Sequence, residues 1–210
     1  MKLFEVLAHL AFFTGLFEKV FHTHLIPFPA IIMAFGALMV LVLSIVRFWS
    51  TNKHKAIIGF ALFLWMVYLI LVLKYFLPYQ IPVLTVAILM SIYTSFRVIK
   101  ERMLNYNILL WLILMISGLS LTFMPLADRY YIINIKFNST LYEDPFFWDR
   151  YSWWLNIDNR HEEATAANDT ALKIINKWED GPEKMEWKTM VEEHRNKLDT
   201  KSWTLFHDHH

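Results

Sequence analysis

The chain has 210 residues, of which 56% are hydrophobic, and it includes 9 Trp, 9 Tyr and 17 Phe. Such a composition is too apolar for an ordinary soluble domain and indicates a membrane protein. There is no cysteine, which excludes disulfides, thiolate nucleophiles and iron–sulfur clusters.

Charge and hydrophobicity divide the chain near residue 125. Residues 1–125 carry nine Lys and Arg against three Asp and Glu, whereas residues 126–210 carry eleven against sixteen. We therefore predict an all-α membrane protein, with a transmembrane bundle over residues 1–125 and a small α-rich domain over residues 126–210. Because the second part is acidic, phosphates would be repelled, and nucleic acid is not expected as a partner.

The first part contains five apolar stretches that are long enough to cross a bilayer. A helix rises about 1.5 Å per residue, so roughly twenty apolar residues cross the ~30 Å hydrocarbon core. The clearest stretch is AIIGFALFLWMVYLILVL, residues 56–73, which has no charged residue and no polar face. The five predicted spans are residues 3–21, 28–49, 56–76, 81–98 and 107–124.

Basic residues near the span ends predict how the chain is threaded. We expect the first stretch to be retained rather than cleaved as a signal peptide, because its basic region is Lys2 alone and no A-x-A site follows. The basic residues of one side are Lys2, Arg47, Lys53, Lys55, Arg97, Lys100 and Arg102, and those of the other are Lys19 and Lys74. Cytoplasmic loops carry the excess of Lys and Arg. The N-terminus is therefore expected in the cytoplasm and, after five spans, the C-terminal domain outside.

The sequence of residues 126–210 predicts an extended segment followed by helices. Residues 130–137, YYIINIKF, have the β-branched and aromatic content of a short strand or an extended exit from the membrane. Asp144 followed by Pro145 predicts an N-cap and a first helical residue. The expected starts of the next two helices are Asn168 or Asp169, for a helix through about Trp178, and Gly181-Pro182. In the last helix Trp187, Val191, His194 and Leu198 form one stripe.

Glu5 and His9 are four residues apart, so they share one face of the first predicted span. Ionisable side chains inside a bilayer are costly, and they suggest a functional site that passes a proton or orients a ligand. Together with Glu18, they are the candidates for an intramembrane polar site. The alternative is that Glu5 lies at the cytoplasmic interface and that neutral His9 bonds to a neighbouring helix.

A metal site is a second candidate. Glu18 and His22 are four residues apart, His24 is close, and the chain ends in His207, Asp208, His209 and His210 on the same predicted side. Two side chains at this spacing can hold Zn²⁺, although no motif with zinc spacing is present. The alternative is a histidine cluster at the membrane interface that binds lipid phosphate or nothing.

Aromatic residues give a third candidate, a surface that docks a protein partner. Trp153 and Trp154 follow Phe146, Phe147 and Trp148 closely, and Trp187 and Val191 belong to the stripe of the last helix. We name Trp153, Trp154, Trp187 and Val191 as candidate docking residues. The alternative is that these side chains form a core or lie on the membrane. Asn138 and Asn168 begin two N-x-[ST] sequons.

The sequence contains no H-E-x-x-H, G-x-S-x-G or Gly-rich phosphate loop, and no ionisable residue in the central parts of spans two to five. We therefore expect no catalytic residue and no cofactor.

The segment Gly15-Leu-Phe-Glu-Lys-Val-Phe-His22, followed by a Pro-containing turn and an apolar span, resembles the first hairpin of the GldL-type inner-membrane proteins of Bacteroidota. The likeness covers residues 15–48 and implies an envelope protein in the inner membrane of a similar bacterium. In that family the motor function depends on an acidic residue inside a bundle of two spans. The second span here has no acidic residue and five spans are predicted, so the resemblance implies no motor function.

We expect a non-enzymatic accessory or scaffold subunit of an envelope complex, embedded in the lipid bilayer, whose outward C-terminal domain docks a protein partner. One alternative is a transporter or proton-coupled component that uses Glu5, His9 and Glu18. Another is a metal-dependent enzyme at the outer surface, built on His22, His24 and His194. A homo-oligomer is compatible with each of them.

Overall fold

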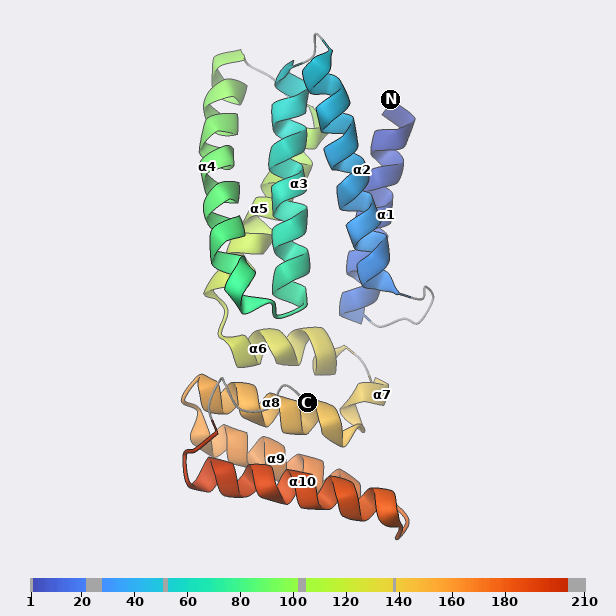
Figure 1. Ribbon diagram of the computed structural model, residues 1–210, viewed down its shortest axis with the longest axis vertical. Coiled ribbons are helices and arrows are strands. Elements are labelled where there is room, and N and C mark those ends of the chain that lie inside the picture. The colour runs from blue at the N-terminus through green and yellow to red at the C-terminus, as the bar shows by residue number, and fades with distance from the viewer. Residues whose placement is uncertain (1, 22–27, 51–52, 102–104, 138, 204–210) are drawn as a thin grey trace. The chain divides into compact units, whose positions relative to one another are not determined.

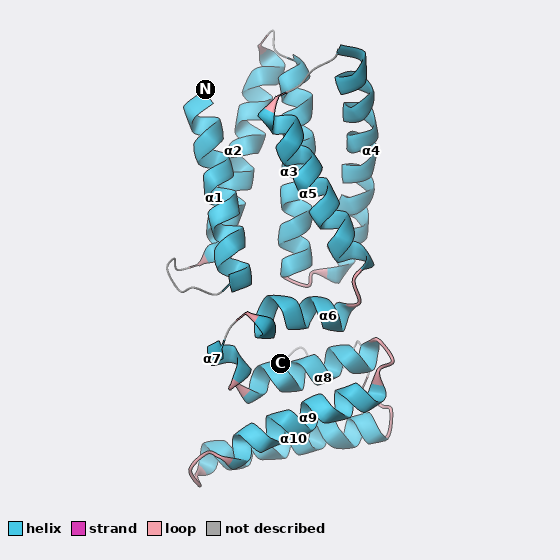
Figure 2. Ribbon diagram, turned by 180° about the vertical axis from the view of Figure 1, so that it is seen from behind, coloured by secondary structure: helices cyan, strands magenta, loops and turns pink. Residues whose placement is uncertain are grey.

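The structure is a computed structural model that describes residues 2–21, 28–50, 53–101, 105–137 and 139–203. These residues form helices and no strand (Figure 1; Figure 2), which confirms the all-α prediction for this part of the chain. The chain separates into two compact units, Met1–Phe123 and Met124–His210.

The first unit has five described helices, which pack side by side (Figure 1). They are α1 (Lys2–Phe21), α2 (Pro29–Trp49), α3 (Lys53–Leu73), α4 (Leu77–Glu101) and α5 (Tyr106–Phe123). Helix α3 contacts α2, α4 and α5, and its side chains Trp65, Met66 and Val72 are fully buried. Helix α1 packs along α2.

Four of these helices, α2 to α5, are long and apolar enough to cross a membrane. Within the most apolar window of each, α3 has 61% of its residues buried, whereas α4 has 17%. The outer helices therefore expose large apolar faces, as expected for helices in contact with lipid. Helix α1 is not among the four, since it carries charged residues at both ends.

The fourth span begins earlier than predicted, because α4 starts at Leu77 and includes both prolines of the expected connection. Pro78 lies in the first turn, where a backbone N–H has no intrahelical acceptor, so proline is tolerated there. Pro82 lies further inside the helix. Between them, the Gln80 amide donates to the Leu71 carbonyl of α3 at 3.3 Å and links the two helices.

Two glycines let α1 and α2 approach closely. A Cβ atom on Gly36 would lie 2.7 Å from the Ala8 carbonyl oxygen and 2.7 Å from the Phe12 backbone nitrogen. A Cβ atom on Gly15 would lie 2.6 Å from the Pro29 carbonyl oxygen. Small residues permit such backbone contact between membrane helices, where close packing replaces the hydrophobic effect as the source of association.

The second unit contains α6 (Leu126–Tyr131), the π-helical segment η1 (Ile132–Lys136), α7 (Ser139–Tyr142), α8 (Pro145–Ile157), α9 (His161–Asn176) and α10 (Pro182–Asp199). Helix α8 contacts α6, α9 and α10, and α9 lies beside α10. The side chains of Leu155, Ile175 and Val191 are fully buried, so this unit has an apolar core of its own.

The strand or extended segment predicted over residues 130–137 is wrong, because α6 continues into η1 there. The aromatic side chains pack on α8 rather than in a sheet. The Tyr130 ring lies 6.4 Å from the Trp154 ring, and the Tyr131 ring lies 5.3 Å from the Tyr151 ring. Strand propensity largely reflects how side chains pack on their neighbours, so tertiary contacts can override it.

The predicted starts of α8 and α10 are confirmed. Asp144 is the N-cap of α8, and its carboxylate accepts a hydrogen bond from the Phe146 backbone N–H at 2.9 Å. Gly181 precedes α10, and Pro182 is the first residue of that helix.

The predicted start of α9 is wrong, since the helix begins at His161 and not at Asn168 or Asp169. Asn168 lies inside the helix and is fully buried. The residues that face the core are small and recur at helical spacing, namely Ala164, Ala167, Ala171 and Ile175. Alanine is less hydrophobic than Leu or Ile, so this stripe is hard to recognise in the sequence. The helix was therefore predicted to begin only at Asn168 or Asp169, which are residue types common at helix N-caps.

We expect Gly36→Ala to destabilise the first unit by about 1–3 kcal/mol, because the added methyl group forces α1 away from α2. Thermal unfolding of the full chain in nanodiscs measures this change. Gly181→Ala is the matched control, since a Cβ atom on Gly181 meets no atom within 4 Å. A loss no larger than that of the control would contradict the close contact.

Candidate functional site

A buried ion pair in the first unit joins α1 and α2 and contacts α5. The Arg47 guanidinium on α2 donates two hydrogen bonds to the Glu5 carboxylate on α1, at 2.7 and 2.6 Å. The Asn107 amide on α5 donates another, at 2.6 Å. These three residues are only 5–6% exposed. Because a bidentate Arg–carboxylate pair is strong and directional, it fixes the three helices relative to one another at this level.

The structure places Glu5 inside the helix bundle and not at an exposed end of α1. A lone charge inside an apolar helix bundle is costly, and the guanidinium of Arg47 offsets much of that cost. Neither Arg47 nor Asn107 was identified from the sequence as a site residue. Each lies near a span end, where long polar side chains ordinarily reach water, so their positions alone gave no signal.

His9 lies one turn after Glu5 on α1 and is 5% exposed. Its ring packs edge-to-face against the Tyr106 ring, with centroids 5.9 Å apart. Within the described residues neither ring nitrogen has a hydrogen-bond partner, so the expected bond to a neighbouring helix is not formed there. A cavity of about 10 Å³ adjoins Glu5, His9, Ser44 and Arg47.

Glu18, the third predicted residue of an intramembrane site, is buried but lies apart from this cluster. It follows Glu5 by thirteen positions on one helix, which corresponds to about 20 Å along the axis. Between His9 and Glu18 the buried face of α1 is formed by Phe12 and Gly15. The buried face of α1 therefore carries no continuous row of polar side chains.

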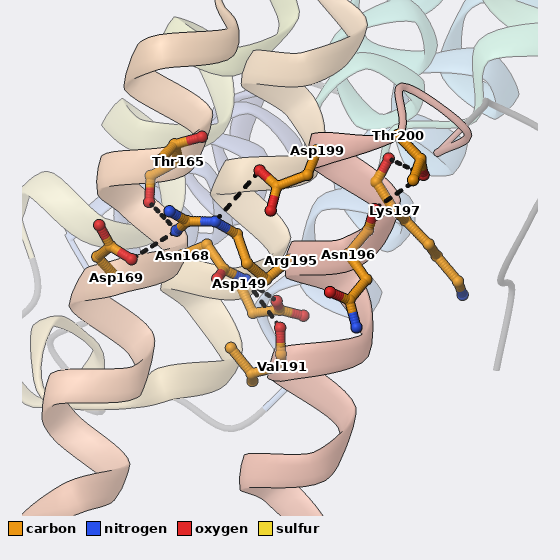
Figure 3. Close-up of polar contacts among 10 residues, drawn as sticks. All are labelled: Asp149, Thr165, Asn168, Asp169, Val191, Arg195, Asn196, Lys197, Asp199 and Thr200. Atoms are coloured by element: carbon orange, nitrogen blue, oxygen red, sulfur yellow. Dashed lines mark hydrogen bonds and ion pairs between the residues drawn. The ribbon is translucent and has the colours of Figure 1, made fainter.

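The second unit has a polar network that joins α8, α9 and α10. The Asp149 carboxylate accepts a hydrogen bond from the Asn168 amide at 3.2 Å and lies 2.7 Å from His194 Nδ1. The same amide donates to the Val191 carbonyl at 3.2 Å (Figure 3). The Trp203 ring stacks on the His194 ring, with centroids 4.4 Å apart. The network therefore holds the side chains of Asp149, His194 and Trp203 in place.

Arg195 links α9 and α10 beside this network (Figure 3). Its guanidinium bonds to the Asp169 carboxylate, lies 3.3 Å from the Thr165 carbonyl oxygen and lies 3.5 Å from Asp199. These groups are partly exposed, so each ion pair contributes little to stability.

Arg160 makes a comparable link between α6 and α9. Its guanidinium donates to Asp128 at 2.5 Å and to Glu163 at 2.8 and 2.6 Å. These hydrogen bonds lower the pKa of the Glu163 carboxyl group and raise the pKa of Arg160. All three side chains reach solvent, and we regard this set as structural.

A groove of about 330 Å³ lies beside the Asp149 network, between α8 and α10. Its apolar walls are formed by Phe146, Trp153, Trp187, Met190 and Trp203. This volume is in the range of pockets that hold small ligands or single anchoring side chains. Three tryptophans in one groove are typical of binding surfaces, where large aromatic side chains carry much of the free energy of binding.

The groove also contains hydrogen-bond donors. The Arg150 guanidinium lies over the Trp153 ring, 5.0 Å from its centroid, and makes no ion pair among the described residues. The indole N–H of Trp153 also lacks an acceptor among the described residues, but its nitrogen is buried and is not offered to a ligand in the groove. Lys197 adds a second cation, and Glu193 adds an anion. With Asp149, the lining therefore carries two cations and two anions. The Arg150 guanidinium, which has no ion-pair partner among the described residues, favours a ligand that brings an acceptor.

Of the four residues predicted to dock a partner, Trp153 and Trp187 line this groove, whereas Trp154 and Val191 do not. Trp153 and Trp154 are each 4% exposed and Val191 is fully buried, so these three belong mainly to the core. Trp187 is partly exposed.

The groove residues that were not identified from the sequence are Asp149, Arg150, Met190, Glu193, Lys197 and Trp203. The sequence contained a signal for three of them, Arg150, Met190 and Lys197. On α8, Phe146, Arg150 and Trp153 recur at positions i, i+4 and i+7, which places them on one helix face. On α10, Trp187, Met190 and Lys197 recur at i, i+3 and i+10, again on one face. That the two faces border a single groove follows only from the packing of the helices.

The proposed metal ligands His22 and His24 lie outside the described residues, as do His207 to His210. Among the residues that are described, no group of three or more His, Cys, Asp and Glu side chains could hold a metal ion. His194 is engaged with Asp149. Of the two sequons, Asn138 is also outside the described part, and Asn168 is fully buried, which makes it inaccessible to a glycan in the folded unit.

Comparisons with protein-family models, with curated proteins and with solved structures give no match to this chain. The likeness of residues 15–48 to GldL-type proteins stays a prediction from that segment. The polar cluster and the groove are therefore the features that bear on function.

Removing one partner of the buried Glu5–Arg47 pair should lower the free energy of unfolding more than removing both partners. We expect Glu5→Leu or Arg47→Met alone to destabilise it by about 3–5 kcal/mol, since the remaining charge is buried without a counterion. The double variant should recover most of that loss. Unfolding of the full chain in nanodiscs gives the double-mutant cycle. Losses that simply add in the double variant would contradict a coupled pair.

Proposed function

We propose that this chain is a non-enzymatic integral membrane protein, an accessory or scaffold subunit of an envelope complex, whose second unit binds a segment of a protein partner. The observation that carries this proposal is the groove between α8 and α10. Its walls are aromatic, and the Asp149–His194–Trp203 contacts hold one wall in place before a ligand arrives. A groove that is already formed loses little conformational entropy on binding.

The chemistry of the groove favours a partner segment with an apolar side chain next to a carboxylate. The apolar side chain would pack between Trp187 and Trp203, and the carboxylate would accept hydrogen bonds from the Arg150 guanidinium. Arg binds carboxylates through a planar pair of donors. A carboxylate from an acidic side chain and one from a chain terminus satisfy the same donors.

The polar cluster of the first unit favours a structural role over transport. Both oxygens of Glu5 are engaged by Arg47 and Asn107, and apolar residues separate His9 from Glu18 on α1. A transporter would be expected to line a path with polar groups from side to side. We therefore propose that the cluster anchors α1 in the bundle.

We further propose that α1 is a fifth span, with the N-terminus in the cytoplasm and the second unit outside the inner membrane of a bacterium. The neutralised Glu5 and the close contact of α1 with α2 at Gly36 support the span. The excess of Lys and Arg in the loops on the N-terminal side supports the orientation.

Single-cysteine variants test this threading without background, because the chain has no cysteine. In intact cells an impermeant maleimide should label Thr200→Cys and should leave Lys2→Cys and Lys53→Cys unlabelled until the membrane is permeabilised. The N-terminus and the second unit lie on opposite sides only if the number of spans is odd. Equal labelling of Lys2→Cys and Thr200→Cys would contradict a fifth span, and a reversed pattern would contradict the orientation.

Site-specific photocrosslinking of the full chain in its native membrane tests the docking proposal. A photoreactive residue at Met190 should capture a protein segment that carries an apolar residue beside a carboxylate. A probe at Thr189, which is exposed on a neighbouring face of α10, is the matched control. Trp187→Ala and Arg150→Gln should each reduce capture from Met190 about tenfold or more, as for central contacts of an interface.

Three results would contradict docking of a protein segment in this groove. One is capture from Thr189 as strong as from Met190, and another is capture that neither substitution reduces. The third is an adduct from Met190 with lipid or a small molecule alone.

A further inference from the structure

The cavity beside His9 is small, but several polar side chains line it. It measures about 10 Å³ and is lined by Glu5, His9, Ser44 and Arg47 together with apolar side chains. This volume is close to the minimum that holds one water molecule. Its position inside the first unit separates it from the groove of the second unit, so it is not explained by partner docking.

His9 is the group that the protein leaves unsatisfied here. Only 5% of the residue is exposed, and neither ring nitrogen meets a donor or acceptor among the described residues. Buried polar groups are nearly always hydrogen-bonded, to protein or to ordered water. A neutral imidazole has one donor and one acceptor, so the ring can bond to a small neutral ligand.

The remaining acceptors of the cavity can be counted. A carboxylate has about four acceptor sites. Arg47 and Asn107 use three of them on Glu5, two on Oε1 and one on Oε2, and the Tyr106 hydroxyl is a further hydrogen-bond donor to this carboxylate. Ser44 Oγ donates to the Val40 carbonyl at 2.6 Å, which leaves its lone pairs free to accept. Ser44 Oγ is thus the acceptor that stays free beside the imidazole.

We propose that this cavity binds a single water molecule, which accepts a hydrogen bond from the ring N–H of His9 and donates one to Ser44 Oγ. Buried waters make two to four hydrogen bonds, and this arrangement supplies two. The Arg47 guanidinium repels a metal cation, the Glu5 carboxylate repels an anion, and the volume excludes a larger neutral molecule. The water links His9 on α1 to Ser44 on α2 in one hydrogen-bond network.

This water also gives the buried imidazole a route for proton exchange. A bound water that contacts the ring N–H passes magnetisation and protons to it, whereas a dry imidazole receives neither. The network is closed on the α3 side by Gly59 and Leu62, which have no titratable group. The Tyr106 ring and the Asn107 amide border the cluster from α5.

Water-edited solid-state NMR on the full chain in nanodiscs, with ¹⁵N-labelled His and Trp, tests the proposal. The His9 ring signal, assigned by its loss in His9→Gln, should receive magnetisation from water. The internal controls are the indole N–H groups of Trp65 and Trp111, which are buried and bond to Ser91 Oγ at 2.8 and 3.2 Å. Those indole N–H groups should receive much less magnetisation from water, because each already donates its hydrogen bond to Ser91 Oγ.

Ser44→Ala removes the acceptor of the proposed water and should reduce or abolish transfer to His9 while leaving the Trp65 and Trp111 signals unchanged. Transfer to His9 in the native chain that is no stronger than transfer to the indoles would overturn the proposal. Transfer that persists undiminished in Ser44→Ala would overturn the placement of the water between Ser44 and His9.

Discussion

The first unit depends on how a carboxylate can be buried inside an apolar helix bundle. Helix α1 carries Glu5 into that interior, where a charge without a counterion would be costly. Arg47 and Asn107 remove this penalty from two other helices, one of them 102 residues away in the sequence. The pair therefore works together with the contacts at Gly15 and Gly36, which bring α1 close enough to α2 for the guanidinium to reach.

The second unit uses a polar network in a similar way but next to a binding surface. Asp149 accepts from Asn168 and faces His194, so one buried carboxylate joins three helices. Because His194 also stacks on Trp203, the network positions an aromatic wall of the groove. Aromatic walls and an Arg150 guanidinium without an ion-pair partner among the described residues distinguish this groove from the exposed ion pairs elsewhere in the unit. Because of this contrast, we assign a binding role to the groove and a structural role to Arg160 and Arg195.

The two units thus divide the proposed work between them. Helices α2 to α5 expose apolar faces, as expected for contact with lipid, and the contacts of Glu5 with Arg47 and Asn107 hold the inside of the bundle together. The second unit has its own core and contains the groove between α8 and α10. The proposed water at His9 belongs to the first unit, where it gives the ring N–H of a buried imidazole an acceptor.

The sequence by itself determined the features that depend on local composition and spacing. It identified the apolar helices α2 to α5, the N-cap at Asp144 and the start of α10 at Gly181-Pro182, because length, hydrophobicity and capping are read from neighbouring residues. It also singled out Glu5 and His9 as an unusual pair. Only the tertiary structure decided which residues surround them, since Arg47 and Asn107 come from distant helices and look ordinary at span ends. The same reason explains the helical residues 130–137, the buried Asn168 and the groove, because packing between helices is not encoded in any single stretch.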